Sequence, residues 1–399
     1  MDLIGWVIFI VALLFSVMLH ESGHFVTAKK FGMKITRYFV GFGPTIWSTW
    51  RGETEYGIKA LPFGGFVKIV GMTSLDEVDD PADEPRSFRS HPAWQRIIVL
   101  CAGSFMHFVL AFVLLLVLLL GIGLQNPSNA AQLGTIIPCV ASNVTALDNG
   151  VCTASNPPSP ARLAGLRPGD KVIAFDGTPV SNWTQLGNAI SRARPGSRVT
   201  ITVVRDGKTL TSHTTLAAVK GRSGGYLGIE APEVYTTVSP VRAVQYAGSA
   251  FEQVIVGSVK GVAALPAALP KLFGKDRANT AAGQVSSVVG LANNTGQEVA
   301  ANVGWQSKVS FVLLLMAELN IFFGAFNLLP LLPMDGGHVA AIIWERIRAW
   351  FARLRGRPDP GLVDMTKLLP VSFSIFAVVI FFSVVLILAD IVNPVNIAG

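Results

Sequence analysis

Four long stretches of apolar residues divide the chain, and each is long enough to supply the roughly 20 residues that a helix needs to cross a bilayer. They cover residues 1–26, 97–124, 309–332 and 371–389. The first has no basic amino-terminal region and no small-residue cleavage site, so it is typical of a retained span and not of a signal peptide. The pattern predicts a polytopic α-helical membrane protein with four transmembrane helices.

About 185 residues of ordinary soluble composition separate the second and third spans. Within 134–234, a short helix and turn at 159–170 precede a strand at 171–175, a helix near 185–193 and a strand hairpin at 199–215. With its Gly-Leu-Arg-Pro-Gly-Asp signature, this order resembles a PDZ domain of the permuted bacterial protease type. The resemblance implies an inserted α+β domain that binds peptides at a sheet edge. Another small domain with the same turn chemistry is the alternative.

Composition and charge place these elements relative to the membrane. The 399 residues are 51% hydrophobic and only 14% charged, which excludes a disordered chain. Ten Lys and Arg residues lie in 27–96 and six in 337–368, whereas 125–145 and 390–399 contain none. Because short cytoplasmic loops are enriched in Lys and Arg, both termini and the inserted domain are expected on the exoplasmic side of the plasma membrane. The net charge of +7 then reflects topology, and nucleic acid is not an expected partner.

Residues 239–308 are expected to lie on the exoplasmic surface as amphipathic helices with an irregular stretch, because apolar helical periodicity gives way there to Gly, Asn and Ser. The basic segment 337–368 is expected to form a cytoplasmic loop or helix.

A metal-binding pattern stands at the cytoplasmic end of the first span, where His20 and His24 lie one helical turn apart. Glu21 between them is placed to activate a bound water. This is the arrangement of zinc proteases, in which a third protein ligand leaves one position open for water. The non-functional alternative is a chance match of polar residues at a helix end. Three clustered ionisable groups within a span are costly without a partner, and this favours Zn²⁺.

The third ligand is expected after the third span, where two prolines and two glycines flank Asp335. This carboxylate would lie at the membrane depth of His24, and the glycines would let the backbone approach the metal closely. Without the two histidines, a plain helix N-cap would be the preferred interpretation. Asn327 either binds substrate backbone or satisfies a local carbonyl.

Residues 53–68 alternate apolar and polar side chains, as a membrane-associated β hairpin would. Its exposed edge near Gly64 and Gly65 could pair with an extended substrate segment whose amides need new hydrogen bonds in a low-dielectric setting. An amphipathic loop lying on the membrane is the alternative.

The three cysteines and His107 carry further expectations. Cys139 and Cys152 are expected to form a disulfide, since they share a short exoplasmic loop. Cys101, inside the second span, is expected to pack as a small apolar residue. His107 in the same span is either a hydrogen-bonded packing residue, which is favoured, or a fourth metal ligand.

Together these motifs resemble the site-2 protease family of intramembrane zinc metalloproteases, in particular the actinobacterial form of the regulator-of-sigma-E protease group. The resemblance covers nearly the whole chain and rests on His-Glu-Ser-Gly-His at 20–24, Gly-Phe-Gly-Pro at 41–44, Leu-Pro-Phe-Gly-Gly-Phe-Val-Lys at 61–68, one PDZ-like domain, and the segment from Asn327 to Asp335-Gly-Gly. The second span departs from the family pattern, because the usual Pro and Asn are replaced within Gly103-Ser-Phe-Met-His107.

The resemblance implies a zinc metalloendopeptidase that acts in regulated intramembrane proteolysis. Zinc would be held by His20, His24 and Asp335, and Glu21 would be the catalytic base. Single-span membrane proteins, such as anti-sigma factors already trimmed by a first protease, would be the substrates. The inserted domain would select which substrates enter. A membrane-tethered PDZ adaptor with a non-catalytic metal site is the alternative from another class, and a metallopeptidase for soluble peptides is disfavoured by the position of the histidines within a span.

Overall fold

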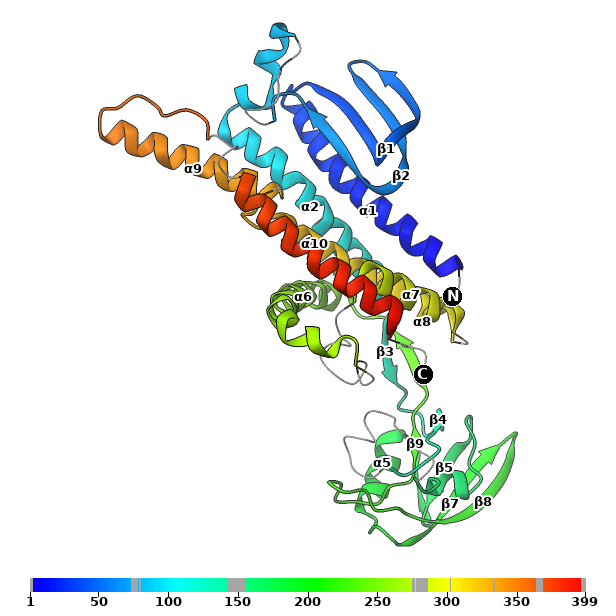
Figure 1. Ribbon diagram of the computed structural model, residues 1–399. Coiled ribbons are helices and arrows are strands. Elements are labelled where there is room, and N and C mark those ends of the chain that lie inside the picture. Colours follow the sequence, from blue (N-terminus) through cyan, green and yellow to red (C-terminus); the bar gives the residue numbers. More distant parts are fainter. Residues whose placement is uncertain are drawn as a thin grey trace. The chain divides into compact units, whose positions relative to one another are not determined.

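The structure is a computed structural model that describes residues 3–72, 78, 80–141, 152, 156–274, 277, 286–301, 303–332, 334–363 and 369–395 (Figure 1). Most of the loop between Cys139 and Cys152, and much of the expected irregular stretch after residue 274, lie outside these ranges. The chain folds into two compact units. Unit 1 contains Met1–Ile122 and Val238–Gly399, and unit 2 is Gly123–Thr237.

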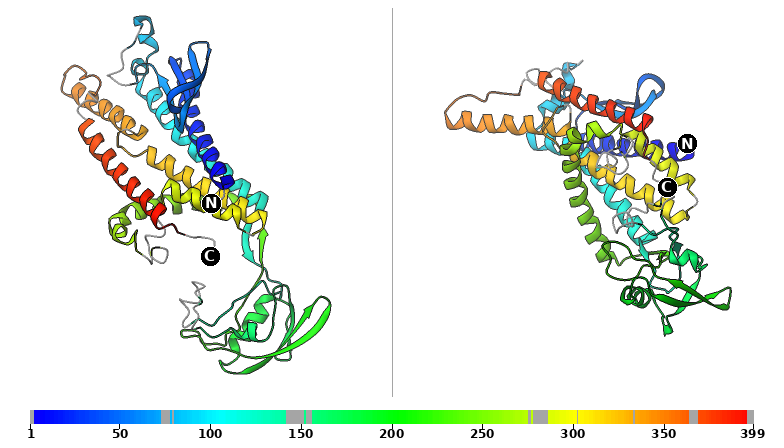
Figure 2. Two further views of the ribbon diagram at one scale, coloured as in Figure 1. Left: turned by 45° about the vertical axis from the view of Figure 1, so that its right-hand side comes forward. Right: turned by 60° about the horizontal axis from the view of Figure 1, so that its bottom comes forward.

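Four long apolar helices of unit 1 correspond to the expected spans: α1 (Leu3–Lys30), α2 (Ala93–Val117), α8 (Trp305–Asn327) and α10 (Leu369–Val392). A π-helical segment, Leu118–Ile122, extends α2. Helices α1, α2 and α8 pack on one another, whereas α10 contacts α7 (Val288–Ala300) and the end of α6 (Figures 1 and 2). Gly23 of α1 lies so close to α2 that an added Cβ would be 2.4 Å from the carbonyl oxygen of Ala102. Small residues thus bring the first two helices together at the depth of the histidines.

A fifth helix, α6 (Pro240–Ala268), is also long and apolar enough to cross a membrane, so the described structure has five such helices and not the four expected. Together with α7 it accounts for the helices expected within 239–308, although α7 lies in the part expected to be irregular. In Figure 1 it is seen nearly along its axis, whereas α1, α2, α8 and α10 run obliquely across the view. It starts beside the end of α2, where Val238 N bonds to Leu119 O, and it ends where Ala268 packs on Ala389 of α10.

An antiparallel β sheet lies against α1 and consists of β1 (Ile35–Arg51) and β2 (Thr54–Ile69). Strand β2 bends back across β1. Tyr38 of β1 therefore pairs with Val67 near the end of β2 on one side and with Tyr56 near its start on the other. The Tyr38 hydroxyl bonds to Ser22 Oγ of α1 at 2.8 Å and fastens the sheet beside the metal-binding motif. The expected hairpin at 53–68 is therefore only part of a larger sheet, and β1 was not expected.

Helix α9 (Asp335–Leu354) follows α8 after a short turn and forms the basic segment on that side. Arg96 of α2 donates to Glu345 of α9 at 3.0 Å, and both side chains are at most 10% exposed. A second oxygen of Glu345 accepts from the backbone of Val363. Because a buried ion pair holds its partners in a defined geometry, α9 is fixed on α2 with its first residue directed inward.

Unit 2 is a mixed α/β domain with its own core. A four-stranded antiparallel sheet has the order β6 (Thr178–Pro179), β5 (Lys171–Phe175), β7 (Arg198–Arg205) and β8 (Lys208–Thr215). Helices α4 (Pro160–Leu163) and α5 (Trp183–Arg192) accompany it, as expected from the sequence pattern. The pairs β4 (Thr135–Ile136) with β9 (Ile229–Glu230), and β3 (Leu124–Pro127) with β10 (Glu233–Thr236), complete the unit. The β3–β10 pair brings the two ends of the unit together.

Two side-chain links stabilise unit 2. Cys139 and Cys152 form a disulfide with their Cα atoms 5.9 Å apart, as the sequence predicts, and Cys101 carries a free thiol. Asp170 is 1% exposed and accepts two hydrogen bonds from Arg205, each 2.7 Å long.

Candidate metal centre and active site

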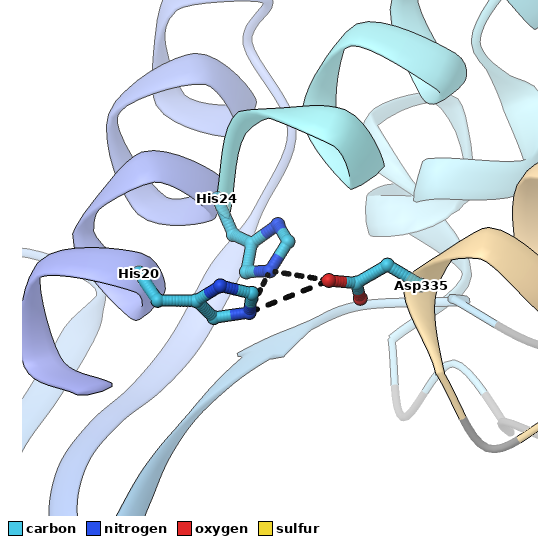
Figure 3. A group of neighbouring side chains, drawn as sticks. All are labelled: His20, His24 and Asp335. Atoms are coloured by element: carbon cyan, nitrogen blue, oxygen red, sulfur yellow. Dashed lines mark hydrogen bonds and ion pairs between the residues drawn. The ribbon is translucent and has the colours of Figure 1, made fainter. Parts of the chain in front are cut away.

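The imidazoles of His20 and His24 lie side by side, because the two residues are one turn apart on α1. Their Nε2 atoms are 3.0 Å apart, and both residues are 7% exposed (Figure 3). The Nδ1 atom of His24 lies 2.8 Å from the carbonyl oxygen of Val99. A carbonyl only accepts, so Nδ1 carries a proton, which leaves Nε2 as the nitrogen available to a metal ion.

Asp335 supplies the third donor from the first residue of α9. Its Oδ2 atom lies 3.3 Å from Nε2 of His20 and 3.4 Å from Nε2 of His24 (Figure 3). The N-cap of α9 is Met334, and Oδ2 accepts no hydrogen bond from any described residue. Asp335 is thus not an N-cap, and its carboxylate points at the two imidazoles.

The glycines after Asp335 lie against the turn between α8 and α9. A Cβ on Gly336 would lie 2.3 Å from the carbonyl oxygen of Leu328, and one on Gly337 would lie 2.7 Å from that of Leu331. The glycines therefore let α9 approach the turn that precedes it. They fix where Asp335 starts the helix.

The three donor atoms fit a tetrahedral zinc ion. With zinc–ligand bonds of about 2.0–2.1 Å, two ligands of a tetrahedral site are about 3.3 Å apart. The observed separations of 3.0, 3.3 and 3.4 Å are close to this value. A buried carboxylate oxygen without a hydrogen bond beside two imidazole nitrogens needs a cation to offset its desolvation. The donor set, two nitrogens and one oxygen, is of the kind that catalytic zinc sites use.

Gly103 of α2 completes the walls of the centre. An added Cβ would be 2.4 Å from Nε2 of His24 and 2.7 Å from Nε2 of His20. Real Cβ atoms essentially never come within 3.0 Å of such neighbours, so only glycine leaves room for the imidazoles. In the sequence Gly103 stands out only as part of a divergent motif, because the sequence does not show which side of α2 faces α1.

A cavity of about 910 Å³ opens from the centre and is mostly apolar. It brings together nearly all the expected site residues: Glu21, Asn327, Gly64, Gly65, His20 and Asp335 all line it. Gly65 lies against the catalytic motif, since an added Cβ would be 3.7 Å from Cγ of Glu21. The cavity continues along α1 to Phe9 and Trp6, beside α7.

His107 lines the same cavity but lies outside the group of three donors, whose atoms are all within 4.8 Å of one another. Its ring centroid is 4.8 Å from that of His20. The residue is 3% exposed and hydrogen-bonds to Asn320 of α8. The geometry therefore favours the hydrogen-bonded interpretation over a fourth metal ligand.

Comparisons with known proteins agree with this site. Residues 8–357 match the model of peptidase family M50. The chain is similar to the zinc metalloprotease Rip1 of Mycobacterium tuberculosis, with 37% identity over 98% of each chain. It is 38% identical to Rip1 of Mycobacterium bovis, again over 98% of each chain, and 37% identical to Rip1 of Mycolicibacterium smegmatis over 99% of this chain and 98% of the relative.

The chain belongs to peptidase family M50, the site-2 protease family. The family and these relatives confirm the expectation of a zinc metalloprotease. The long apolar helices of the chain make it a multi-pass membrane protein.

Proposed function

We propose that this protein is an endopeptidase that hydrolyses single-span membrane proteins within the bilayer, using zinc. One observation carries the proposal: His20, His24 and Asp335 converge at 3.0–3.4 Å at one wall of a mostly apolar cavity that also contains Glu21. A membrane-tethered adaptor would have no use for such a convergence of buried ionisable groups, because each is costly to bury in a span.

The roles follow from the chemistry of the donors. His20, His24 and Asp335 would hold the zinc ion, which supplies Lewis acidity and lowers the pKa of a bound water to about 7. Glu21 accepts the proton of the attacking water and returns it to the amine that leaves. The bond from His24 Nδ1 to Val99 fixes the imidazole that faces the metal position.

Substrate binding is assigned to the side of the cavity formed by β2. A transmembrane helix shields its peptide bonds, so the scissile segment must become extended before hydrolysis. Gly64 and Gly65 lie where an extended segment could pair with the backbone of the sheet beside Glu21. Asn327, the last residue of α8, lines the same cavity and can donate to or accept from this segment.

The wider setting is proposed from charge and fold pattern. The Lys and Arg distribution supports a plasma-membrane protein with both termini and unit 2 exoplasmic and the metal centre toward the cytoplasm. Helix α6 starts beside the end of α2 and ends beside the end of α10, which supports four crossing helices with α6 at the exoplasmic surface. The order of elements in unit 2 supports a PDZ domain that selects substrates. Anti-sigma factors trimmed by a first protease are the proposed natural class.

Cleavage of a labelled single-span protein in detergent tests the function, with wild type compared with Glu21→Gln and Asp335→Ala. Glu21→Gln should keep about one zinc per chain and lose cleavage, because the carboxylate serves only the water. Asp335→Ala should lose both zinc and cleavage. Proteolysis at the wild-type rate by Glu21→Gln would contradict the mechanism.

A further inference from the structure

A polar network crosses the core of the bundle one helical turn from His20. It has one member from each of three helices: Ser16 of α1, His107 of α2 and Asn320 of α8. All three are at most 3% exposed. The metal ligands do not belong to it, and neither the motif nor the roles assigned above use it.

The hydrogen bonds determine how the network is protonated. Asn320 Nδ2 donates to the carbonyl oxygen of Met316 at 2.7 Å, so Oδ1 of this amide faces the network. Ser16 Oγ donates to that oxygen at 2.6 Å. His107 Nδ1 lies 2.8 Å from the same oxygen, and because the oxygen can only accept, Nδ1 must carry a proton.

The other nitrogen of His107 is consequently a hydrogen-bond acceptor. A neutral imidazole has one proton, and a charged ring this deeply buried in a span would be costly. Nε2 therefore presents a lone pair, and it has no hydrogen-bond partner within the part of the chain that the structure describes. Since Nδ1 is engaged with Asn320, Nε2 is the ring nitrogen left for a partner in the cavity that His107 lines together with Glu21 and Asp335.

We propose that His107 accepts a hydrogen bond from a backbone N–H of the peptide segment in this cavity and so orients that segment for cleavage. The inference rests on the proposed function. An extended segment directs N–H groups to both of its edges, and one edge would pair with β2. The groups on the other edge are cut off from water and require acceptors from the protein. The ring of His107, with its tautomer fixed by Asn320, offers such an acceptor without rearrangement.

A purely structural role would leave this nitrogen unused. Ser16 and Asn320 already bond to each other, so a side chain with a single donor would be enough to connect α2 to the pair. A fourth-ligand role would require the ring to join the three converging donors, and it lies outside that group. Substrate contact is the role that uses both nitrogens of the ring.

The test measures peptide binding in the Glu21→Gln background, where the peptide is held and not cut. The probe is a fluorescein-labelled Leu-Ala span of about 20 residues flanked by lysines, with an Asn-Gly pair in its cytoplasmic third. Single amide bonds are replaced in turn by esters, which removes one N–H donor at a time. The dissociation constant is measured for each peptide with the His107 parent and with His107→Phe, His107→Gln and Ser104→Ala.

With the parent, the ester at the contacted position should weaken binding about tenfold, as expected for one net hydrogen bond. With His107→Phe, binding of the all-amide peptide should weaken by a similar factor, and that ester should have no further effect. His107→Gln, which can still accept, should restore the ester effect. Ser104→Ala, one turn away and with a buried hydroxyl that has no partner among the described residues, should behave like the parent.

Zinc affinity, measured by chelator competition, should be unchanged in His107→Phe. Loss of zinc in this variant would make His107 a ligand and overturn the inference. Equal ester effects with and without the imidazole would also overturn it, while leaving the protease assignment intact if wild type still cleaves the all-amide peptide. Failure of wild type to bind or cleave that peptide would refute the proposed function, and the role of His107 with it.

Discussion

Replacing Gly103 by alanine should weaken zinc binding at the metal centre while leaving the fold in place. The added Cβ would be 2.4 Å from Nε2 of His24, about 0.6 Å inside the 3.0 Å limit that real contacts respect. Zinc sites tolerate displacements of about 0.2 Å in ligand distance, so the imidazole cannot both avoid the methyl group and keep its position. We expect zinc affinity to fall about 10- to 100-fold, which is the range seen when a metal ligand loses the partner that orients it.

Alanine is otherwise the better helix former by about 1 kcal/mol, so the substitution should not unfold α2. Zinc affinity is measured by competition with a chromophoric chelator in detergent, and the fold is followed by thermal unfolding. Gly121→Ala is the matched control, because a Cβ there meets nothing within 4 Å. Zinc affinity and cleavage at wild-type levels in Gly103→Ala would refute the argument that the imidazoles need this space.

Other predictions concern unit 2. Alkylation of the denatured, non-reduced protein should modify only the thiol of Cys101, and reduction should expose two more, because Cys139 and Cys152 are bonded; three reactive thiols before reduction would contradict this. Burial favours the neutral acid at Asp170, but the bonds from Arg205 outweigh it and hold the pKa of Asp170 below its ordinary value. A lowered pKa stabilises the fold above the ordinary carboxyl pKa of about 3.9, and this contribution is lost as the pH falls below it. Urea unfolding of the isolated unit between pH 3 and 7 should show this loss of stability. Asp170→Asn should lower the free energy of unfolding by about 2 kcal/mol at neutral pH and remove much of its pH dependence. An unchanged pH profile in Asp170→Asn would argue against the ion pair. Excision of unit 2 should leave zinc binding intact and permit cleavage of untrimmed substrates, whereas continued dependence on trimming would place substrate selection elsewhere.

Much of the metal centre is predictable from the sequence because its chemistry is local. His20, Glu21 and His24 share one helix, and a spacing of four residues places both imidazoles on one face whatever the rest of the chain does. Asp335 required one further step, the assumption that the ends of two spans lie at the same depth. The long apolar helices α1, α2, α8 and α10 follow from length and composition alone.

The residues that the sequence did not predict depend on how helices are rotated about their axes. Gly103 matters only because it faces the imidazoles, and Asn320 only because its amide meets His107. Strand β1 was missed for a different reason. Its register shifts repeatedly, so the regular alternation that identifies a strand is interrupted. Helix α6 combines apolar and small residues, which fit a surface helix and a crossing helix equally well.

The division of the metal centre between two distant parts of the chain has a consequence in time. His24 and Asp335 are separated by roughly 310 residues. At a synthesis rate of about 5–20 residues per second, the ribosome needs roughly 15–60 s to proceed from one to the other. Helix α2 is completed in the first third of that interval, but the carboxylate that completes the donor set does not exist until its end. A partly synthesised chain therefore lacks the complete donor set and cannot act as a zinc protease before its synthesis is nearly finished.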